Sequence, residues 1–379
     1  MTGRNSLAGI AGWAVVCLSA GAAEAASFER FLEAPGILQS GGEQLLESVL
    51  VASPRQYDPP ALESEPYLGD EPLAGVPQRF DSNAPVARNR QAARRQTSLT
   101  RMLRGGVDRW AFEVDGLLLW QGNVASRPLL TSGGGTTLDA NQADAATSAG
   151  PRYRIGFDVD RCHAFEGIYF RVEEFDSDVS VAGGDPANLP IAGPLQPASL
   201  LTLGRIQSAE FNWRRSNGGV ITWLMGFRWV EWAQAMAVVD SASMPSAGVV
   251  ALAGNDLYGS QIGADMLLWN AWPRFRLSGN SKAGIYGNRS YFQAAGIPSG
   301  GPSAMAGREV SFFGEAGLVA DVGITSWLTW RTGYNVYWLT GVALPATNLS
   351  ADMFTAGATL NTGQSVLLHG VMTGLEARW

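Results

Sequence analysis

Few residues of this sequence have side chains that commonly carry catalysis. It contains two histidines and two cysteines, and one of each stands together at Cys162-His163. A thiol and an imidazole can act as nucleophile and base, but adjacent residues of an extended segment point to opposite sides, and no third group is placed to orient the imidazole. The pair is also two ligands short of a structural zinc site. We predict a histidine in a turn, with no catalytic residue, no metal site and no cofactor.

Charged side chains are scarce, which limits the partners that the chain can have. Of the 379 residues, 16% are charged and 46% are hydrophobic, and the formal net charge is -7. Average proteins have about a quarter charged residues. The acidic balance argues against a nucleic-acid partner. Asp176, Asp178 and Asp185 could hold a cation loosely, although solvated loop residues explain them better.

The first 106 residues have the character of segments that precede a folded domain. Residues 1–25 have a positive start, an apolar stretch at Leu7–Ala20 and an Ala-x-Ala site at Ala23–Ala25, which predicts a cleaved secretory signal peptide. Residues 26–106 carry many prolines and no sustained period, so we predict a mostly disordered periplasmic segment. Its basic stretch Arg88–Arg104 could contact lipid headgroups or the acidic cell-wall polymer, although a solvated linker is the simpler interpretation.

From residue 107 onward, apolar and polar side chains alternate with the period of two that is typical of strands. Pro151–Arg161 is the clearest case, because Tyr153, Ile155 and Phe157 alternate with charged residues. No apolar run here approaches the roughly 18–20 residues of a membrane helix, and 46 glycines disfavour helices. Ten such segments can be traced: Arg109–Trp120, Pro151–Arg161, Glu166–Asp176, Leu200–Trp213, Gly219–Trp232, Asp256–Trp269, Pro273–Asn288, Arg308–Val322, Trp327–Thr340 and Ser365–Trp379.

The connections between these segments alternate between short and long. A soluble sandwich has no reason to sort its loops in this way, whereas outer-membrane barrels have short periplasmic turns, longer outer loops and an even strand count. We therefore predict an all-β chain whose residues 107–379 form an antiparallel up-and-down transmembrane β-barrel of ten strands, twelve being the alternative, in a bacterial outer membrane. The long connections are Gln121–Gly150, Ser177–Ser199, Ala233–Asn255, Arg289–Gly307 and Gly341–Gln364.

The last segment, Ser365–Trp379, fits the strand that closes such a barrel. Leu367, Val371 and Leu375 fall on one face, and small or charged residues fall on the other. The terminal aromatic Trp379 is similar to the C-terminal signal of other outer-membrane barrels, which implies insertion into outer-membrane lipid by the barrel-assembly machinery.

Aromatic residues fall near the ends of the predicted strands. They match the two interfacial girdles of a membrane barrel. His369 falls on the lipid-facing side, so it forms neither the Asp–His nor the Ser–His arrangement of outer-membrane proteases and phospholipases, and we predict that the chain is not an enzyme. The girdle residues are Trp110, Trp213, Trp327 and Trp379 at periplasmic ends and Trp120, Trp232 and Trp338 at outer ends.

The polar face of each strand places charges of both signs in the predicted lumen. Cationic and acidic residues occur there in comparable number, which favours neutralised pairs over a selectivity ring of one sign. The interior of a small barrel is also filled by its own side chains. We therefore expect a narrow or plugged lumen. Its cationic candidates are Arg154, Arg171, Arg228, Arg274, Arg276, Lys282, Arg331 and Arg378, and its acidic candidates are Asp158, Asp160, Glu173, Glu210, Asp265, Glu315, Asp321 and Glu376.

Four stretches resemble a known family. Gly254–Trp269, Lys282–Asn288, Phe312–Pro345 and Leu368–Trp379 are similar to the outer-membrane β-barrel family of planctomycete-type bacteria named beta-barrel porin type 7. The resemblance covers roughly residues 109–379. It implies an outer-membrane barrel but little about transport, because the porin name rests on the barrel itself.

Two functions stay open from the sequence. We expect a narrow porin or passive channel for ions or small solutes. The alternative is a structural or surface-interaction barrel with a closed lumen and functional outer loops. Conductance across a lipid bilayer would distinguish them.

Overall fold

The computed structural model describes residues 110–122, 126–143, 147–240, 247–272, 274–297, 303–350, 353 and 358–379. The predicted signal peptide, the Pro-rich segment and its basic stretch Arg88–Arg104 lie outside the described residues. None of the described helices has the length and apolar character needed to cross a membrane.

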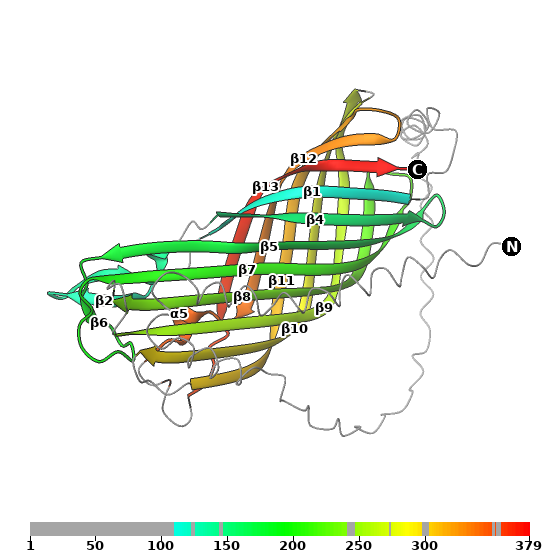
Figure 1. The fold of residues 1–379 in the computed structure, drawn as a ribbon. Coiled ribbons are helices and arrows are strands. Elements are labelled where there is room, and N and C mark those ends of the chain that lie inside the picture. The colour runs from blue at the N-terminus through cyan, green and yellow to red at the C-terminus, as the bar shows by residue number, and fades with distance from the viewer. Residues whose placement is uncertain are drawn as a thin grey trace, which may run out of the picture.

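Ten antiparallel strands close into a barrel (Figure 1), which confirms the predicted fold and strand number. Each strand pairs with the barrel strands before and after it in the sequence, as the alternating turns and loops require. The barrel strands are β1 (Trp110–Gln121), β4 (Thr147–Asp158), β5 (His163–Val181), β7 (Ala198–Ser216), β8 (Ile221–Asp240), β9 (Gly248–Trp272), β10 (Phe275–Ile297), β11 (Ser303–Gly323), β12 (Leu328–Val342) and β13 (Gln364–Arg378).

The barrel closes between its first and last strands. β1 and β13 pair from Ala111–Arg378 to Gln121–Leu368. The backbone N–H groups of Trp110 and Trp379 each donate to the other residue's carbonyl oxygen at 3.1 Å. The prediction that Ser365–Trp379 closes the barrel is therefore confirmed. We call the end that carries Trp110 and Trp379 the inner end and the opposite end the outer end.

The strands are tilted relative to the barrel axis. Gly122, directly after β1, is hydrogen-bonded to Leu367 of β13. Following directly paired residues from Leu367 through all the other barrel strands leads back to β1 at Trp110, at its opposite end. A closed barrel needs such a stagger, with strands inclined by about 35–45°. Directly paired residues therefore lie at different heights along the barrel axis. From β5 to β11, each successive partner lies closer to the outer end.

The wall has an apolar outer face. The outward side chains of Ile262, Ile285 and Val310 are 68%, 70% and 73% exposed, whereas the inward Gln261 and Tyr286 are almost fully buried. The period of two in the sequence produces this arrangement directly. A barrel with an exposed apolar band and polar interior is typical of the outer membrane.

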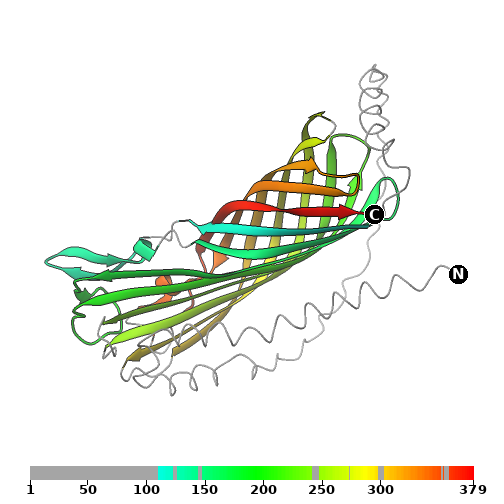
Figure 2. The same ribbon diagram turned by 45° about the horizontal axis from the view of Figure 1, so that its top comes forward.

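One side of the wall is much taller than the other (Figure 2). β8, β9, β10 and β11 have 20, 25, 23 and 21 residues, whereas β1 has 12. A membrane strand needs only about 9–11. The predicted long loops Ala233–Asn255 and Arg289–Gly307 are therefore wrong in large part, since β8, β9, β10 and β11 continue through them. These stretches are rich in Ala, Val and Gly on both faces, so no alternation revealed the strands.

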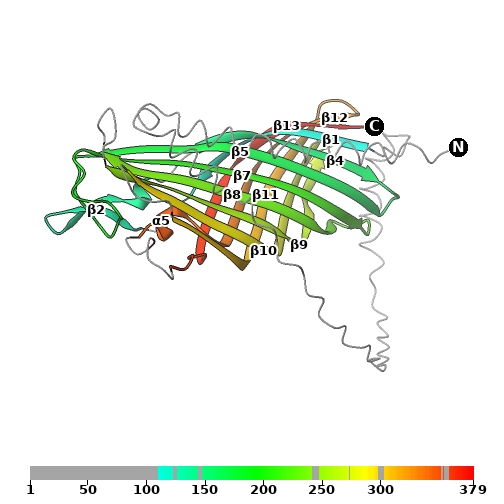
Figure 3. The ribbon, with the colours of Figure 1, turned by 60° about the horizontal axis from the view of Figure 1, so that its bottom comes forward.

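Short elements lie at the outer end beside the tall wall (Figure 3). Their residues Leu130 and Leu138 share one buried cluster with Met236 and Phe292 of the wall. The outer end is therefore a folded structure with its own core, not a set of open loops. The elements are β2 (Pro128–Ser132), β3 (Gly135–Asp139) and β6 (Asp185–Pro186), which form a three-stranded sheet, together with the 3-10 helix η2 (Ala140–Ala143) and the helical turn α5 (Pro345–Asn348).

Candidate functional site in the barrel lumen

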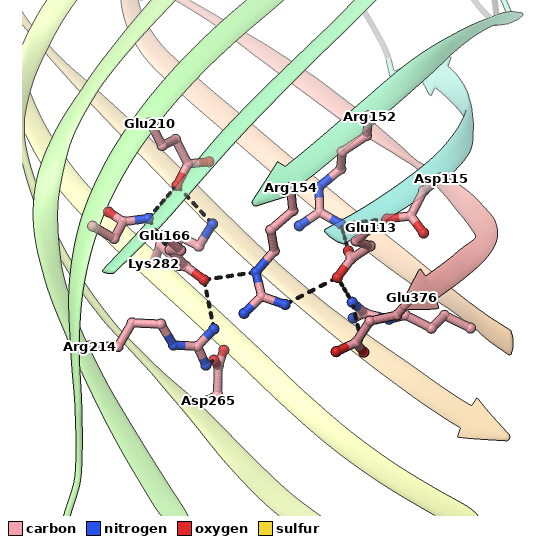
Figure 4. Close-up of polar contacts among 12 residues, drawn as sticks. Glu113, Asp115, Arg152, Arg154, Glu166, Glu210, Arg214, Asp265, Lys282 and Glu376 are labelled. Carbon is pink, nitrogen blue, oxygen red and sulfur yellow. Dashed lines mark hydrogen bonds and ion pairs between the residues drawn. The ribbon is translucent and has the colours of Figure 1, made fainter. Parts of the chain in front are cut away.

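Inward charged side chains fill the inner half of the lumen. Eight carboxylates and eight cationic side chains among the described residues are joined there by ion pairs, so the formal charges balance. Figure 4 shows the central part of this network. Its members are Glu113, Asp115, Glu166, Glu210, Asp265, Glu315, Asp321 and Glu376, with Arg152, Arg154, Arg214, Arg228, Arg276, Lys282, Arg331 and Arg378.

Glu113 of β1 is the first centre of the network. Its carboxylate accepts hydrogen bonds from Arg152 at 2.9 Å and Arg154 at 3.1 Å and forms an ion pair with Arg331. Arg152 also donates to Asp115 at 2.8 Å. Because Glu113 is only 1% exposed, its charge depends on these cations instead of water.

Glu166 of β5 is the second centre. It accepts hydrogen bonds from Arg154 at 2.8 Å and from Arg214 at 2.6 Å. Arg214 continues to Asp265 of β9, and the amide of Asn212 donates to Glu166 at 3.2 Å. Arg154 thus links the first and second centres across the lumen (Figure 4).

Glu210 of β7 is the third centre and lies against an aromatic layer. It accepts from Lys282 at 2.9 Å and Gln261 at 2.8 Å and lies 3.4 Å from Arg228. Arg228 also pairs with Glu315 at 2.8 Å. Since these groups come from β7, β8, β9, β10 and β11, the contacts span neighbouring parts of the wall and fill the space between them.

The remaining pairs lie toward the inner end. Asp321 pairs with Arg276 at 2.6 Å and with Arg331 at 3.1 Å. Glu376 pairs with Arg378 and lies 3.8 Å from Arg331. The side chain of Arg276 is 43% exposed whereas that of Asp321 is buried, so solvent screens the charge of the arginine but not that of the carboxylate.

Four buried aromatic rings form the next layer toward the outer end. Phe170, Tyr286, Phe313 and Tyr337 are each 1% exposed. The ring centroids of Phe170 and Phe313 lie 5.4 and 6.2 Å from that of Tyr337. The guanidinium carbon of Arg228 lies 4.0 Å from the centroid of Phe313, a cation–π contact that joins the charged and aromatic layers.

The chain after β12 folds back into the outer opening. Asn255 of β9 holds Ala343 through both backbone groups, accepting from its N–H at 2.7 Å and donating to its carbonyl at 2.9 Å. Arg127 donates to the carbonyl of Leu349 at 2.7 Å. Val342, Ala343 and Leu349 are completely buried. We call residues 341–349 the plug segment.

Most lumen residues predicted from the sequence lie where they were expected. The contacts described above place these in the network: Arg154, Glu210, Arg228, Asp265, Arg276, Lys282, Glu315, Asp321, Arg331, Glu376 and Arg378. Asp158 and Arg274 lie at the inner end and are exposed.

Four predictions of orientation were wrong. Arg171 and Glu173 pair with each other on the outward face, because in β5 the apolar Phe170 and Val172 point into the lumen. Asp160 lies in the turn between β4 and β5, where it binds His163. Trp232, predicted for the outer girdle, is fully buried inside the barrel. The rule that polar faces line the lumen fails where the lumen itself is apolar.

Five network members were not among the predicted lumen residues: Glu113, Asp115, Arg152, Glu166 and Arg214. The signal for Glu113 and Asp115 was present, since both alternate with the apolar face of Arg109–Trp120. Glu166 had no such signal, because its face of β5 is otherwise apolar.

The residues with catalytic side chains lie apart from this network. The Nδ1 atom of His163 lies 2.9 Å from Asp160, so an acidic partner does accompany the imidazole, contrary to the sequence prediction. Hydrogen bonds from His163 and from the backbone N–H of Cys162 hold the pKa of the Asp160 carboxyl at about 2. No hydrogen bond joins Cys162 to His163 within the described chain. His369 faces outward, as predicted, beside the hydroxyl of Tyr334 at 2.7 Å.

Comparisons with known proteins give structural likenesses only. No protein-family profile matches the chain, and no curated protein matches it. The outer-membrane protease OmpT of Escherichia coli aligns with a TM-score of 0.40 and 9% identity over 72% of this chain and 97% of that one. The translocator domain of the autotransporter NalP of Neisseria meningitidis has a TM-score of 0.38 and 9% identity, over 77% of this chain and 96% of that one. The toluene transporter TodX of Pseudomonas putida has a TM-score of 0.30 and 8% sequence identity, over 75% of this chain and 93% of that one.

Proposed function

We propose that this chain is an outer-membrane β-barrel with a closed lumen and that its function resides at its folded outer end. The exposed apolar outer face supports membrane embedding. The predicted signal peptide and the resemblance to a planctomycete-type barrel family support export to the outer membrane.

The observation that carries the closed lumen is the succession of three layers inside one barrel. Balanced ion pairs fill the inner half, buried rings such as Phe313 and Tyr337 cross the middle, and the plug segment occupies the outer opening. A passive pore needs a continuous polar path that ions can enter and leave. The apolar middle and outer layers interrupt such a path.

A narrow passage for water or small ions is the second candidate. Arg228 Nη2 and Asp115 Oδ1 are buried and have no hydrogen-bond partner within the described chain. Buried polar groups of this kind commonly bind water. Because these atoms lie in the charged layer, they favour local hydration there but supply no path through the aromatic layer.

The outer end offers the surface that the closed-lumen proposal requires. The tall wall and the sheet of β2, β3 and β6 share a buried core. Asp139 is held there by hydrogen bonds from Ser126 at 2.8 Å and from the N–H groups of Arg127 and Asn141 at 2.8 and 3.0 Å. Burial alone would raise the pKa of the Asp139 carboxyl, but these hydrogen bonds outweigh burial and lower that pKa. An ordered platform of this kind suits recognition outside the membrane.

Solute flux into proteoliposomes tests the proposal. Liposomes containing the purified full-length protein should swell no faster in small sugars or amino acids than liposomes without it. A matched variant that lacks 343–361 and carries a Gly-Ser linker should also remain impermeable, because the aromatic and charged layers stay in place. Rapid swelling with the wild-type protein would favour the porin instead.

A further inference from the structure

A row of polar side chains crosses the outward face of the tall wall, where most of that face toward the inner end is apolar. Its six members are direct partners in the strand pairing and each points outward. Because paired residues climb toward the outer end from β5 to β11, the last two members lie farthest from the inner end. The row runs through Arg171, Gln207, Glu231, Asp256, Arg289 and Arg308.

The charges at the β5–β8 end of this row are neutralised by neighbours. Arg171 forms an ion pair with Glu173. Glu231 accepts from Arg205 at 2.6 Å and from the amide of Gln207, and it is 5% exposed. This part of the row therefore needs no external ion.

The β10–β11 end is different. Arg289 and Arg308 are direct partners across the two strands, and both are exposed. Neither forms an ion pair or side-chain hydrogen bond with any residue of the described chain. Like charges directly opposite each other destabilise a sheet. Asp256 is the cross-strand partner of Arg289 on its other side.

Two guanidinium groups side by side offer planar arrays of donors that match the oxygens of a phosphate. Val310, two residues below Arg308 on the same face, is 73% exposed, and Ile285 on β10 is 70% exposed. The arginines therefore stand immediately beyond the apolar band, at the level where lipid headgroups lie. We propose that Arg289 and Arg308 form a binding site for the phosphate of an outer-leaflet lipid headgroup. The inference rests on the proposed membrane embedding.

Lipid retention tests this site. The full-length protein and the double variant R289Q/R308Q are purified in mild detergent from the same outer membranes, and native mass spectrometry measures bound phosphate-bearing lipid. R215Q is the matched control, because Arg215 is also exposed and outward but lies in β7 near the inner end. Loss of two charge-assisted contacts should lower retention by about ten-fold or more. R289K/R308K should fall between the wild type and the glutamine variant, since lysine keeps the charge but not the planar fork.

Equal retention by wild type and R289Q/R308Q would overturn the proposal, as would an equal loss in R215Q. Inorganic phosphate at 100-fold excess over lipid is the second arm: it should leave the lipid bound, and complete displacement would indicate a free-anion site instead of a lipid site. Heat-modifiable gel migration shows that each variant is a folded barrel. If the wild type failed to enter lipid bilayers at all, the proposed membrane embedding would fail independently of this site.

Discussion

The two halves of the lumen are filled in different ways. The inner half is filled by long charged side chains that reach across from opposite strands, such as Arg154 between Glu113 and Glu166. The outer half is filled by apolar side chains and by backbone, since the plug segment is held through the carbonyl and N–H of Ala343. The inner filling is part of the wall, whereas the outer filling is a separate piece of chain.

This difference predicts different responses to mutation. Buried charges are stable only as a set, so removing one partner leaves others uncompensated in a poorly solvated space. An apolar layer loses only the contacts of the residue that is truncated. A docked segment can detach while the barrel remains intact. Each of the following changes tests one of these behaviours.

Glu113→Ala should have the largest effect. It removes the shared acceptor of Arg152, Arg154 and Arg331 and should destabilise the barrel by about 3–5 kcal/mol. Urea unfolding in detergent micelles, followed by heat-modifiable migration, measures the change. Arg276→Ala is the control and should cost clearly less, because Arg276 is 43% exposed and its removal leaves Asp321 paired with Arg331. Similar values for the two variants would show that the network is not a cooperative unit.

Leu119→Ala tests the apolar layer. Leu119 is fully buried in the cluster that includes Trp232, and its truncation should destabilise the barrel by about 3 kcal/mol. The same unfolding assay applies. Leu367→Ala removes a lipid-facing leucine of β13 that is 41% exposed and should have a smaller effect. An equal loss at both positions would argue that the lumen is loosely packed there.

Asn255→Ala should loosen the plug segment without unfolding the barrel. The variant loses both hydrogen bonds to Ala343, worth about 1–3 kcal/mol for buried groups. Hydrogen exchange of residues 341–349 should accelerate by about ten-fold or more, while exchange in β1 and β13 stays as in wild type. Faster exchange throughout the barrel would show that the segment is part of the wall's cooperative unit.

Asp160→Asn should have the smallest effect. Because the pKa of Asp160 falls from 3.8 to about 2 in the folded protein, its contribution is present above pH 3.8 and is lost as the pH falls through about 2. The variant should lack this acid-dependent component of stability. An unchanged acid-unfolding profile would mean that the His163 contact is absent in solution.

The fold could be predicted well because the period of two and the alternation of turn lengths both follow from barrel geometry. Between β7 and β8, for instance, Gly218 has a φ of +74°, which is the left-handed conformation that a tight hairpin turn requires. The lining of the inner half of the lumen was predictable where one face of a strand is apolar and the other is charged, as in Pro151–Arg161. The outer extensions of β8, β9, β10 and β11 were not, because their Ala-, Val- and Gly-rich stretches show no alternation of polar and apolar residues.

The wrong orientations predicted for Arg171, Glu173 and Trp232 have one physical cause. The sequence shows that Arg171 and Phe170 face opposite ways but not which way the lumen lies. That depends on height in the barrel, because the lumen changes from charged to apolar along its axis. Height follows from the stagger between strands, which comes from pairing partners distant in sequence. The plug segment likewise depends on Asn255, about 88 residues from the backbone that it holds.

Single-channel recording in planar lipid bilayers tests the closed lumen most directly. Inserted wild-type protein should give no steady conductance in 1 M KCl at any voltage that the bilayer withstands, because the aromatic layer and the plug segment lie in series. Insertion is verified separately by protease protection of the reconstituted barrel. Steady wild-type conductance that a blocking substitution in the lumen abolishes would contradict the account and establish a channel.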